Sequence, residues 1–278
     1  MIFLNIYSRC EIKRQIKIDN IVTFFNEFFE HDHYFPGETH NFWEIVCVLS
    51  GKVGITAGKD VYVLESGSAV VHEPMEFHSI WSEKGTAPEM IIFSFYAKKM
   101  PKLDGRICSL SEEVVEELRR LSEDSEQIFT YGDERGIEPN SVIPGKELEA
   151  SLFLSRIECT LHKLLSSHSD GLQHQSQSAK NYRFILSVLD KNLYKKLSVT
   201  EIAILCNMSE SNLKKIFNKF AGCGVMHYFN SMKVKKAAEF IGNGFSVKEA
   251  ADRLGFTDQN YFSTVFKRVT GVSPAKYK

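Results

Sequence analysis

The sequence predicts an α+β protein of two domains: an N-terminal β-barrel with helices after it, and a C-terminal domain that is entirely helical. Its 278 residues are enough for two domains of ordinary size. The hydrophobic pattern alternates as in β-strands over the first hundred residues and has helical periodicity after them. Charge is divided as well. Residues 179–278 hold 17 Lys and Arg against 7 Asp and Glu, out of totals of 34 and 35, which leaves 17 against 28 in the rest. A basic third beside an acidic remainder indicates a module that binds a polyanion.

The first hundred residues have the pattern of short strands joined by turns. Residues 43–51 form an apolar run that ends at a glycine, which is typical of a strand buried on both faces. Alternating apolar residues at 53–55 and 62–64 flank a turn at 58–60 and predict a hairpin. Residues 87–96 form another apolar strand. Short strands at this spacing favour a small sandwich or barrel.

Helical periodicity begins at Ser111, a good N-cap followed by glutamates, and predicts a helix over 111–121. The stretch 124–145 contains several Gly and Pro residues and is expected to be a long loop. A second helix covers 145–168 and has an apolar stripe with 4-3-4-3 spacing. This stripe either packs onto the chain's own barrel or pairs with a second subunit in a homodimer. Its members are Ala150, Leu154, Ile157, Leu161 and Leu164.

The polar stretch 169–178 is predicted to be the linker between a first domain, 1–168, and a second, 179–278. No apolar run approaches the roughly 18 residues that a membrane helix needs. The N-terminus lacks the pattern of a signal peptide. The six cysteines are scattered, without metal-finger spacing, which favours reduced thiols. We therefore expect a cytoplasmic protein that does not contact the membrane.

An internal repeat occupies the basic third. Residues 197–222 and 245–271 match at an offset of 48, which becomes 49 in the second half, and such self-similarity indicates a duplicated unit. In each copy a serine, Ser198 or Ser246, stands three residues before a glutamate, the spacing of a capping box. Each copy therefore predicts a helix, a tight turn and a second helix. This is the helix-turn-helix pattern, whose second helix enters the DNA major groove.

The turns and caps of the two copies follow from the same comparison. Asn207 and Gly255 can adopt the left-handed conformation that ends a helix. Ser209 and Thr257 are the predicted N-caps of the two second helices. Between the copies, residues 226–242 predict one long helix, which would hold the two units at a fixed separation.

With these features, the last hundred residues resemble the DNA-binding domain of the AraC/XylS family of bacterial transcription regulators. The shared marks are "IA" in the first unit, "KKAAEFI" in the connecting helix, and "GF", "YF", "FKR" and "SP" in the second. The resemblance implies two reading helices in successive major-groove segments of double-stranded DNA, roughly 34 Å apart. It also implies contact with RNA polymerase and favours activation over repression.

The outward faces of the two second helices supply the candidate DNA contacts. Lys214 can donate to guanine O6 and N7 or to phosphate, and Gln259 and Asn260 can each pair with adenine. The family often has an arginine where Thr264 stands, so we expect weaker base reading by the second helix. Lys267 and Arg268, which flank the reading face of the second helix, are suited to phosphate contacts. The candidates are Ser211, Asn212, Lys214, Lys215, Gln259, Asn260, Ser263, Thr264, Lys267 and Arg268.

Residues 38–51 and 67–78 resemble the cupin-type barrel that many AraC/XylS regulators carry as a sensor. Because side chains alternate along a strand, His40, Phe42 and Glu44 share one face, which we expect to be the barrel interior. We expect a pocket without metal or cofactor, in which His and Glu bind a small polar ligand such as a sugar. The candidate effector contacts are His40, Phe42, Glu44, His78 and Trp81.

A metal site is the alternative for the same pocket. Metal-using cupins have a histidine where this chain has Glu38. A set of Glu38, His40, Glu44 and His78 could still hold a divalent metal with nitrogen and oxygen ligands.

These features predict a DNA-binding transcription regulator, an activator by family habit, that a small molecule bound in the barrel controls. We expect no enzymatic activity and assign no catalytic residue. Two alternatives remain open. One is a metal-dependent cupin enzyme fused to a DNA-binding module, which stoichiometric metal together with turnover would reveal. The other is a regulator without an effector, which would leave the same DNA footprint with and without metabolites.

Overall fold

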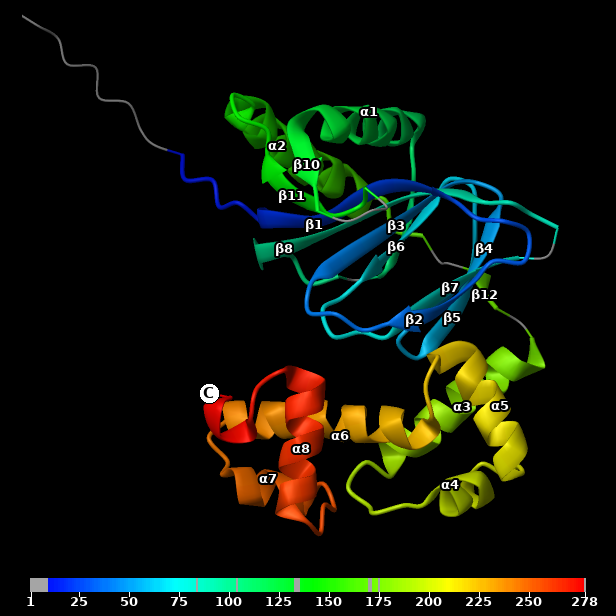
Figure 1. The fold of residues 1–278 in the computed structure, drawn as a ribbon. Helices are drawn as coiled ribbons and strands as arrows, with labels where there is room; N and C mark the ends of the chain where they lie inside the picture. The colour runs from blue at the N-terminus through cyan, green and yellow to red at the C-terminus, as the bar shows by residue number, and fades with distance from the viewer. Residues whose placement is uncertain are drawn as a thin grey trace, which may run out of the picture.

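The computed structural model describes residues 10–83, 85–103, 105–132, 136–169, 172–174 and 176–277. Figure 1 shows two parts, one built of β-sheets with two helices on its far side, and one built only of helices, in which the chain ends. The predicted two-domain α+β fold is confirmed.

Two five-stranded antiparallel sheets make up the first part, within the described residues. In sheet order, the first contains β1 (Lys17–Phe28), β8 (Glu89–Lys99), β3 (Trp43–Ser50), β6 (Ser68–His72) and β9 (Ile107–Ser109). The second contains β12 (Leu172–Gln173), β5 (Asp60–Glu65), β4 (Lys52–Ala57), β7 (His78–Ser82) and β2 (Tyr34–Glu38). The strands predicted around 43–51, 53–55, 62–64 and 87–96 all form.

Strand β3 is buried on both faces, as its unbroken apolar run predicts. Val46 and Val48 belong to an apolar core shared with Ile55 of the second sheet. Ile45 and Cys47 point the other way and pack beneath the two helices. Successive side chains of a strand alternate between faces, so the first sheet separates two cores.

Helices α1 (Glu112–Ile128) and α2 (Glu147–Leu165) cover the outer face of the first sheet. Helix α1 begins after its predicted N-cap, Ser111, whose hydroxyl accepts a hydrogen bond from the backbone N–H of Val114. Burial of one face of each helix in the same core explains why two amphipathic segments fold here.

The prediction of a long loop over 124–145 is wrong. Helix α1 continues into this stretch, and β10 (Phe129–Tyr131) then pairs antiparallel with β11 (Pro139–Val142). Residues 133–135 lie outside the described residues. Phe129 packs edge-on against Phe153 of α2, with ring centroids 5.3 Å apart. This tertiary contact stabilises a hairpin that the local Gly and Pro content does not predict.

The apolar stripe of α2 packs within its own domain, which is one of the two outcomes left open by the sequence. Four of its five members are buried and Leu154 is partly buried. All five belong to the core between the first sheet and the two helices. The opposite face of the helix leaves Leu148 and Leu152 exposed by 84% and 58%.

The stretch 169–178, expected to be a linker, does cross from one part to the other. Its strand β12 pairs antiparallel with β5, so a piece of it joins the second sheet. Residues 170, 171 and 175 lie outside the described residues. The polar composition of this stretch does not predict a strand. The pairing with β5 is made by backbone groups, which leave no pattern in the side chains. Helix α3 (Gln177–Lys191) follows, with Ser176 as its N-cap.

The remaining helices share one apolar core with α3. They are α4 (Val199–Leu205), α5 (Glu210–Ala221), α6 (Val225–Gly242), α7 (Val247–Arg253) and α8 (Gln259–Thr270), followed by a short 3-10 turn, η1 (Pro274–Lys276). Helix α6 is the long connecting helix that the sequence predicts, and Figure 1 shows it running from α5 to α7 and α8.

A buried lysine of α6 joins the two halves of the helical part. Lys233 is 4% exposed, and its ammonium group donates to the carbonyls of Lys195, before α4, and of Leu254, at the end of α7, both at 2.7 Å. Burial lowers the pKa of Lys233 to about 8. These two bonds fix the separation of the units, since one side chain holds both.

Candidate functional site

Both helix-turn-helix units, α4–α5 and α7–α8, form as the repeat predicts. The capping boxes at Ser198 and Ser246 are complete: each serine and the glutamate three residues on exchange side-chain to backbone hydrogen bonds. The turn residues Asn207 and Gly255 have φ angles of 54° and 74°, so both adopt the left-handed conformation. An asparagine tolerates this conformation and a glycine adopts it without steric cost.

The N-caps of the two reading helices, α5 and α8, differ from each other. Ser209 is the N-cap of α5, as predicted. The prediction that Thr257 is the N-cap of α8 is wrong. The N-cap is Asp258, whose carboxylate accepts hydrogen bonds from the backbone N–H groups of Asn260 and Tyr261. The extra residue in the second copy moves the helix start by one position. A carboxylate also reaches two N–H groups and interacts favourably with the helix dipole.

The polar faces of α5 and α8 are turned outward. Nine of the ten candidate DNA contacts are exposed, and Ser263 is partly buried. At matching positions α5 presents Lys214 and Lys215, whereas α8 presents the uncharged Ser263 and Thr264. Their contact with DNA stays a prediction. The inward stripe of α5 is buried as expected: Leu213, Ile216, Phe217 and Phe220.

The barrel touches the C-terminal end of α5. The hydroxyl of Tyr34, on β2, donates to the carbonyls of Asn218 and Lys219 at 3.3 Å and 2.8 Å. The ring of Trp81, on β7, packs on Phe220 with centroids 5.9 Å apart. The last turn of the first reading helix is therefore held by two strands of the second sheet.

Gly222 ends α5 with a φ of 58° and lies against strand β2. A Cβ atom at this position would lie 2.0 Å from the carbonyl oxygen of Pro36 in β2. Gly271 ends α8 with a φ of 79° and would meet no heavy atom within 4 Å. Equivalent glycines thus face a strand in one unit and open space in the other.

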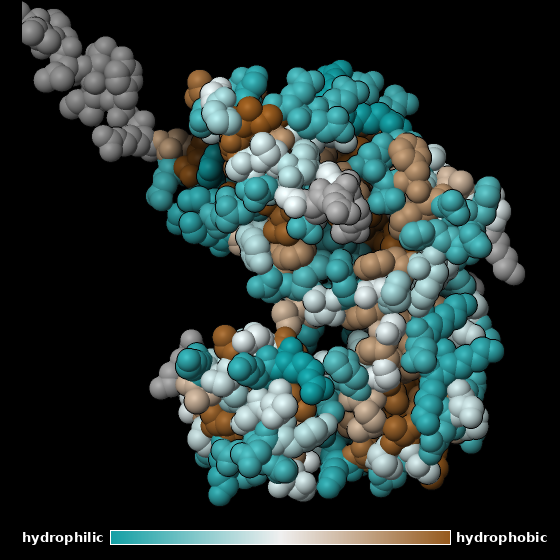
Figure 2. Space-filling model, viewed as in Figure 1, coloured by the Kyte–Doolittle hydropathy of each residue, from teal (hydrophilic) through white to brown (hydrophobic). Residues whose placement is uncertain are grey.

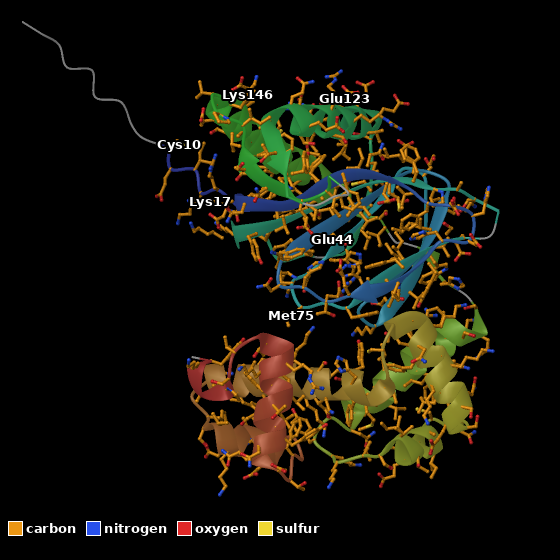
Figure 3. The ribbon with its side chains drawn as sticks, viewed as in Figure 1. Cys10, Lys17, Glu44, Met75, Glu123 and Lys146 are labelled. Carbon is orange, nitrogen blue, oxygen red and sulfur yellow. The ribbon has the colours of Figure 1, made fainter. Side chains whose placement is uncertain are left out.

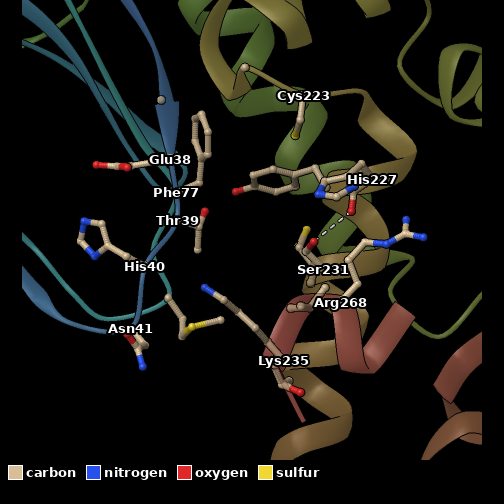
Figure 4. A pocket seen from close by; sticks show the side chains of 18 residues that line it. Glu38, Thr39, His40, Asn41, Phe77, Cys223, His227, Ser231, Lys235 and Arg268 are labelled. Atoms are coloured by element: carbon tan, nitrogen blue, oxygen red, sulfur yellow. Dashed lines mark hydrogen bonds between the residues drawn. The ribbon is translucent and has the colours of Figure 1, made fainter. Parts of the chain in front are cut away.

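A cavity of about 590 Å³ lies between the two parts beside this contact. Figure 2 shows the hollow that separates the sheets from the second unit. Figure 4 shows residues 38–41 on the barrel side, opposite His227 and Lys235 of α6 and Arg268 of α8. Arg268, a candidate phosphate contact, therefore also borders this cavity. Its lining combines acidic and polar groups on one wall with basic groups on the other.

The structure brings Glu38, His40, Glu44 and His78 together at the edge of the barrel interior. One ligand atom from each lies within 4.8 Å of all the others. His78 Nε2 is 3.1 Å from Glu44 Oε1 and 3.9 Å from Glu38 Oε1, and His40 Nε2 is 3.5 Å from Glu44 Oε2. Figure 3 shows Glu44 within the barrel, where it belongs to β3 of the first sheet. Three residues of one short stretch and the more distant His78 thus form one polar cluster.

Burial and neighbouring charge compete in this cluster. Burial alone would raise the pKa of Glu44, but the imidazoles of His40 and His78 outweigh it and hold this pKa well below its usual range. His72, which the sequence analysis did not single out, is fully buried and stacks on His78 with centroids 4.3 Å apart. Burial lowers the pKa of His72 to about 4, so this ring is neutral at pH 7.

Of the five candidate effector contacts, four gather and one does not. Phe42 stacks on His40 with ring centroids 3.8 Å apart, next to Glu44 and His78. Trp81 instead faces α5, and its indole N–H donates to Glu83 at 3.1 Å.

Two family models match the chain: "AraC-like ligand binding domain" over residues 27–176, more than half of the chain, and "Helix-turn-helix domain" over 202–278. The chain belongs to the AraC family. The resemblance drawn from the basic third is confirmed, and this AraC-family protein is a DNA-binding transcription regulator with a ligand-binding domain. None of the helices in its described residues is long and apolar enough to cross a membrane.

Curated relatives of this AraC-family chain include the HTH-type transcriptional activator RhaR of Yersinia pseudotuberculosis, 23% identical over 257 residues, or 88% of this chain and 84% of RhaR. Another is the bifunctional transcriptional activator and DNA repair enzyme AdaA of Bacillus subtilis, 28% identical over 95 residues, 34% of this chain and 45% of AdaA.

Similar solved structures include the C-terminal domain of AraT from Geobacillus stearothermophilus, 29% identical, covering 37% of this chain and 86% of that one with a TM-score of 0.35. Fatty-acid-bound ToxT from Vibrio cholerae is 14% identical and covers 94% of this chain and 96% of its own, with a TM-score of 0.35.

Sequence reasoning on this AraC-family chain missed the residues that join its two parts. Tyr34 and Pro36 stand in a short strand with no periodicity to reveal it. The glycine at the end of α5 could be expected as a helix terminator, but Gly271 has the same local signal without the contact. No local pattern distinguishes the two, because the strand that makes the difference is almost 190 residues away.

Proposed function

We propose that this protein is a transcription activator whose helices α5 and α8 enter successive segments of the DNA major groove. The observation that carries the proposal is a pair of capped reading helices, each with an apolar inner face and a polar outer face. Helix α6 connects them over 18 residues, a rise of about 27 Å. This length is of the same order as the roughly 34 Å turn of B-DNA.

We assign direct base reading chiefly to α5. Lys214 and Lys215 can donate to guanine, whereas Gln259 and Asn260 of α8 suit adenine and Thr264 lacks the bidentate geometry of arginine. The remaining basic residues of the set would position the complex through phosphates.

We further propose that a small polar effector binds in the cavity between the two parts, with sugars as the first class to test. The support is a lining rich in hydrogen-bonding groups, such as Thr39, Asn41 and Tyr228, next to charged Glu38 and Lys235. An effector there would contact both parts at once. It can shift DNA binding only if it binds two arrangements of those parts unequally.

The finer elements of the regulator are also proposals. We divide the chain into a sensor of residues 1–168, a linker of 169–178 and a DNA-binding domain of 179–278. A homodimer would form through the exposed face of α2 that carries Leu148 and Leu152. Contact with RNA polymerase and action in the cytoplasm follow from activation at a bacterial promoter.

Genome-wide mapping of bound sites, followed by footprinting, tests this function. We expect discrete sites protected over two successive major-groove segments, lost in Lys214→Ala and kept in Lys98→Ala, which removes an exposed lysine of the barrel. Scattered binding without a shared motif would contradict the proposal.

The two alternative functions, a metal-dependent enzyme and a regulator without an effector, predict different experimental outcomes. A metal-dependent enzyme fused to a DNA-binding module is favoured by the carboxylate and histidine cluster, and metal-dependent turnover of a substrate would support it. A regulator without an effector would show no thermal shift with any metabolite and an unchanged footprint.

A further inference from the structure

We propose that Glu38, His40, Glu44 and His78 form a binding site for one divalent first-row transition-metal ion, and that this ion controls the contact between the barrel and α5. This proposal replaces the metal-free pocket expected from the sequence. The metal site stands on its own geometry, while its control of α5 rests on the proposed regulatory function.

The two histidines are held in the orientation and tautomer that metal ligands require. His40 Nδ1 lies 3.1 Å from the carbonyl oxygen of Phe42, and His78 Nδ1 lies 3.2 Å from that of Glu76. A carbonyl only accepts hydrogen bonds, so both Nδ1 atoms carry the hydrogen. Metal-binding histidines commonly donate their second ring nitrogen to a carbonyl or carboxylate in this way.

Both Nε2 atoms then face the carboxylates. They are buried, and within the described residues neither has a hydrogen-bond partner of acceptable geometry. The Nε2 atoms lie 3.1 Å and 3.5 Å from the oxygens of Glu44. A metal ion between the rings and the carboxylates would accept an electron pair from each Nε2 and supply the positive charge that the carboxylates face. His78 is 5% exposed, so water does not satisfy its nitrogen.

The spacing of the donors fits an ion of this class. Ligands about 2.1 Å from a tetrahedral ion lie about 3.4 Å from each other. Three of the donor separations, 3.1, 3.5 and 3.9 Å, bracket this value, and all four donor atoms lie within 4.8 Å of one another. Two imidazoles with two carboxylates suit Zn²⁺, Mn²⁺, Fe²⁺ or Ni²⁺, whereas Ca²⁺ and Mg²⁺ prefer oxygen ligands alone.

The site is connected to the DNA-reading part through β2. Glu38 is the last residue of β2, and its carboxylate is the most distant donor, 52% exposed and 3.9 Å from His78. The same five-residue strand carries Tyr34 and Pro36, which contact the end of α5. Drawing Glu38 onto a metal ion would therefore move the strand that holds the first reading helix.

Metal binding is measured on the full-length protein by equilibrium dialysis against Mn²⁺ or Zn²⁺, with the bound ion quantified by mass spectrometry. We expect one ion per chain for the wild type and at least a tenfold loss of affinity in His78→Ala, Glu44→Gln and Glu38→Gln. His31→Ala, which removes an exposed histidine outside the cluster, is the matched control and should bind like the wild type.

Glu38→Gln protects this test against misfolding, because its side chain is half exposed and its loss leaves the buried cluster intact. No ion bound at micromolar concentration, or equal binding by Glu38→Gln and His31→Ala, would overturn the site. Either result would leave the proposed DNA-binding function untouched.

Control of α5 has its own readout, since the chain has only two tryptophans, Trp43 and Trp81, and the second packs on α5. In Trp43→Phe, titration with Mn²⁺ or Zn²⁺ should change the emission of Trp81 with the same midpoint as metal binding. The change should vanish when Glu38→Gln is added. Binding of the ion without any change in Trp81 would overturn the coupling and retain the metal site.

Discussion

The two helix-turn-helix units share their local design but differ in what surrounds them. Both have complete capping boxes, left-handed turns and glycine ends. Within the described residues, the first is the unit that packs against the barrel: Tyr34 and Trp81 contact its last turn, and Pro36 lies against Gly222.

This difference teaches that duplication has reproduced the fold of the unit and not its role. The first unit carries the outward lysines and is also the one that the sensor touches. The second carries Gln259, Asn260 and Thr264 outward and ends at a glycine with open space around it. On the proposed function, a signal from the barrel would therefore reach the unit that carries the outward lysines.

The largest expected effect comes from Gly222→Ala, with Gly271→Ala as its matched control. A left-handed alanine costs roughly 1–2 kcal/mol at either position. At 222 the new methyl group also collides with Pro36, which adds roughly 1–3 kcal/mol or forces the two parts apart. Denaturant unfolding of the full chain in the Trp43→Phe background, followed by Trp81 emission, measures both. Equal losses would mean that the two units do not differ in their contact with the barrel.

Lys233→Met should affect both units together. It removes two charge-assisted hydrogen bonds and leaves two carbonyls unsatisfied, which should cost about 1.5–3 kcal/mol of stability. Lys236→Met, which removes a partly exposed lysine of the same helix paired with Glu239, should cost much less. Thermal unfolding compares them. A Lys233→Met protein as stable as the control would show that this lysine does not join the units.

Lys214→Ala should weaken binding to a specific site by about 1–3 kcal/mol and relax preference at one base pair. Ser263→Ala, at the matching position of α8, should weaken it less. Fluorescence anisotropy with the mapped site and with random DNA separates base reading from phosphate contact. An equal loss of affinity on random DNA would identify Lys214 as a phosphate contact.

Tyr34→Phe is the smallest change. It removes only the hydroxyl that donates to the end of α5, and should cost about 0.5–1.5 kcal/mol. Tyr261→Phe is the counterpart in the second unit, where the hydroxyl accepts from Asn230 at 3.0 Å within the same domain. Only Tyr34→Phe should alter Trp81 emission. A change in both variants would mean that Trp81 reports general loosening.

Much of the candidate site could be predicted because its parts lie on one helix face or within short recognisable motifs. The outward face of α5 follows from helical periodicity, which places Lys214 and Lys215 opposite the buried stripe. Glu38, His40, Glu44 and His78 could be grouped from the spacing of a barrel motif. Their hydrogen bonds, the stacked ring of His72 and the position of Trp81 could not, because they depend on how separate strands pack.

The sequence by itself determined the two-domain fold, the duplicated reading units and the family, since capping, periodicity and charge act within a few residues of each other. Tertiary structure alone decided that 129–142 forms a hairpin, that β12 joins the barrel and that β2 touches α5. The physical reason is range. Backbone pairing and close approach between distant segments leave no periodic trace in either segment, so the glycine that meets Pro36 looks the same in sequence as the one that meets nothing.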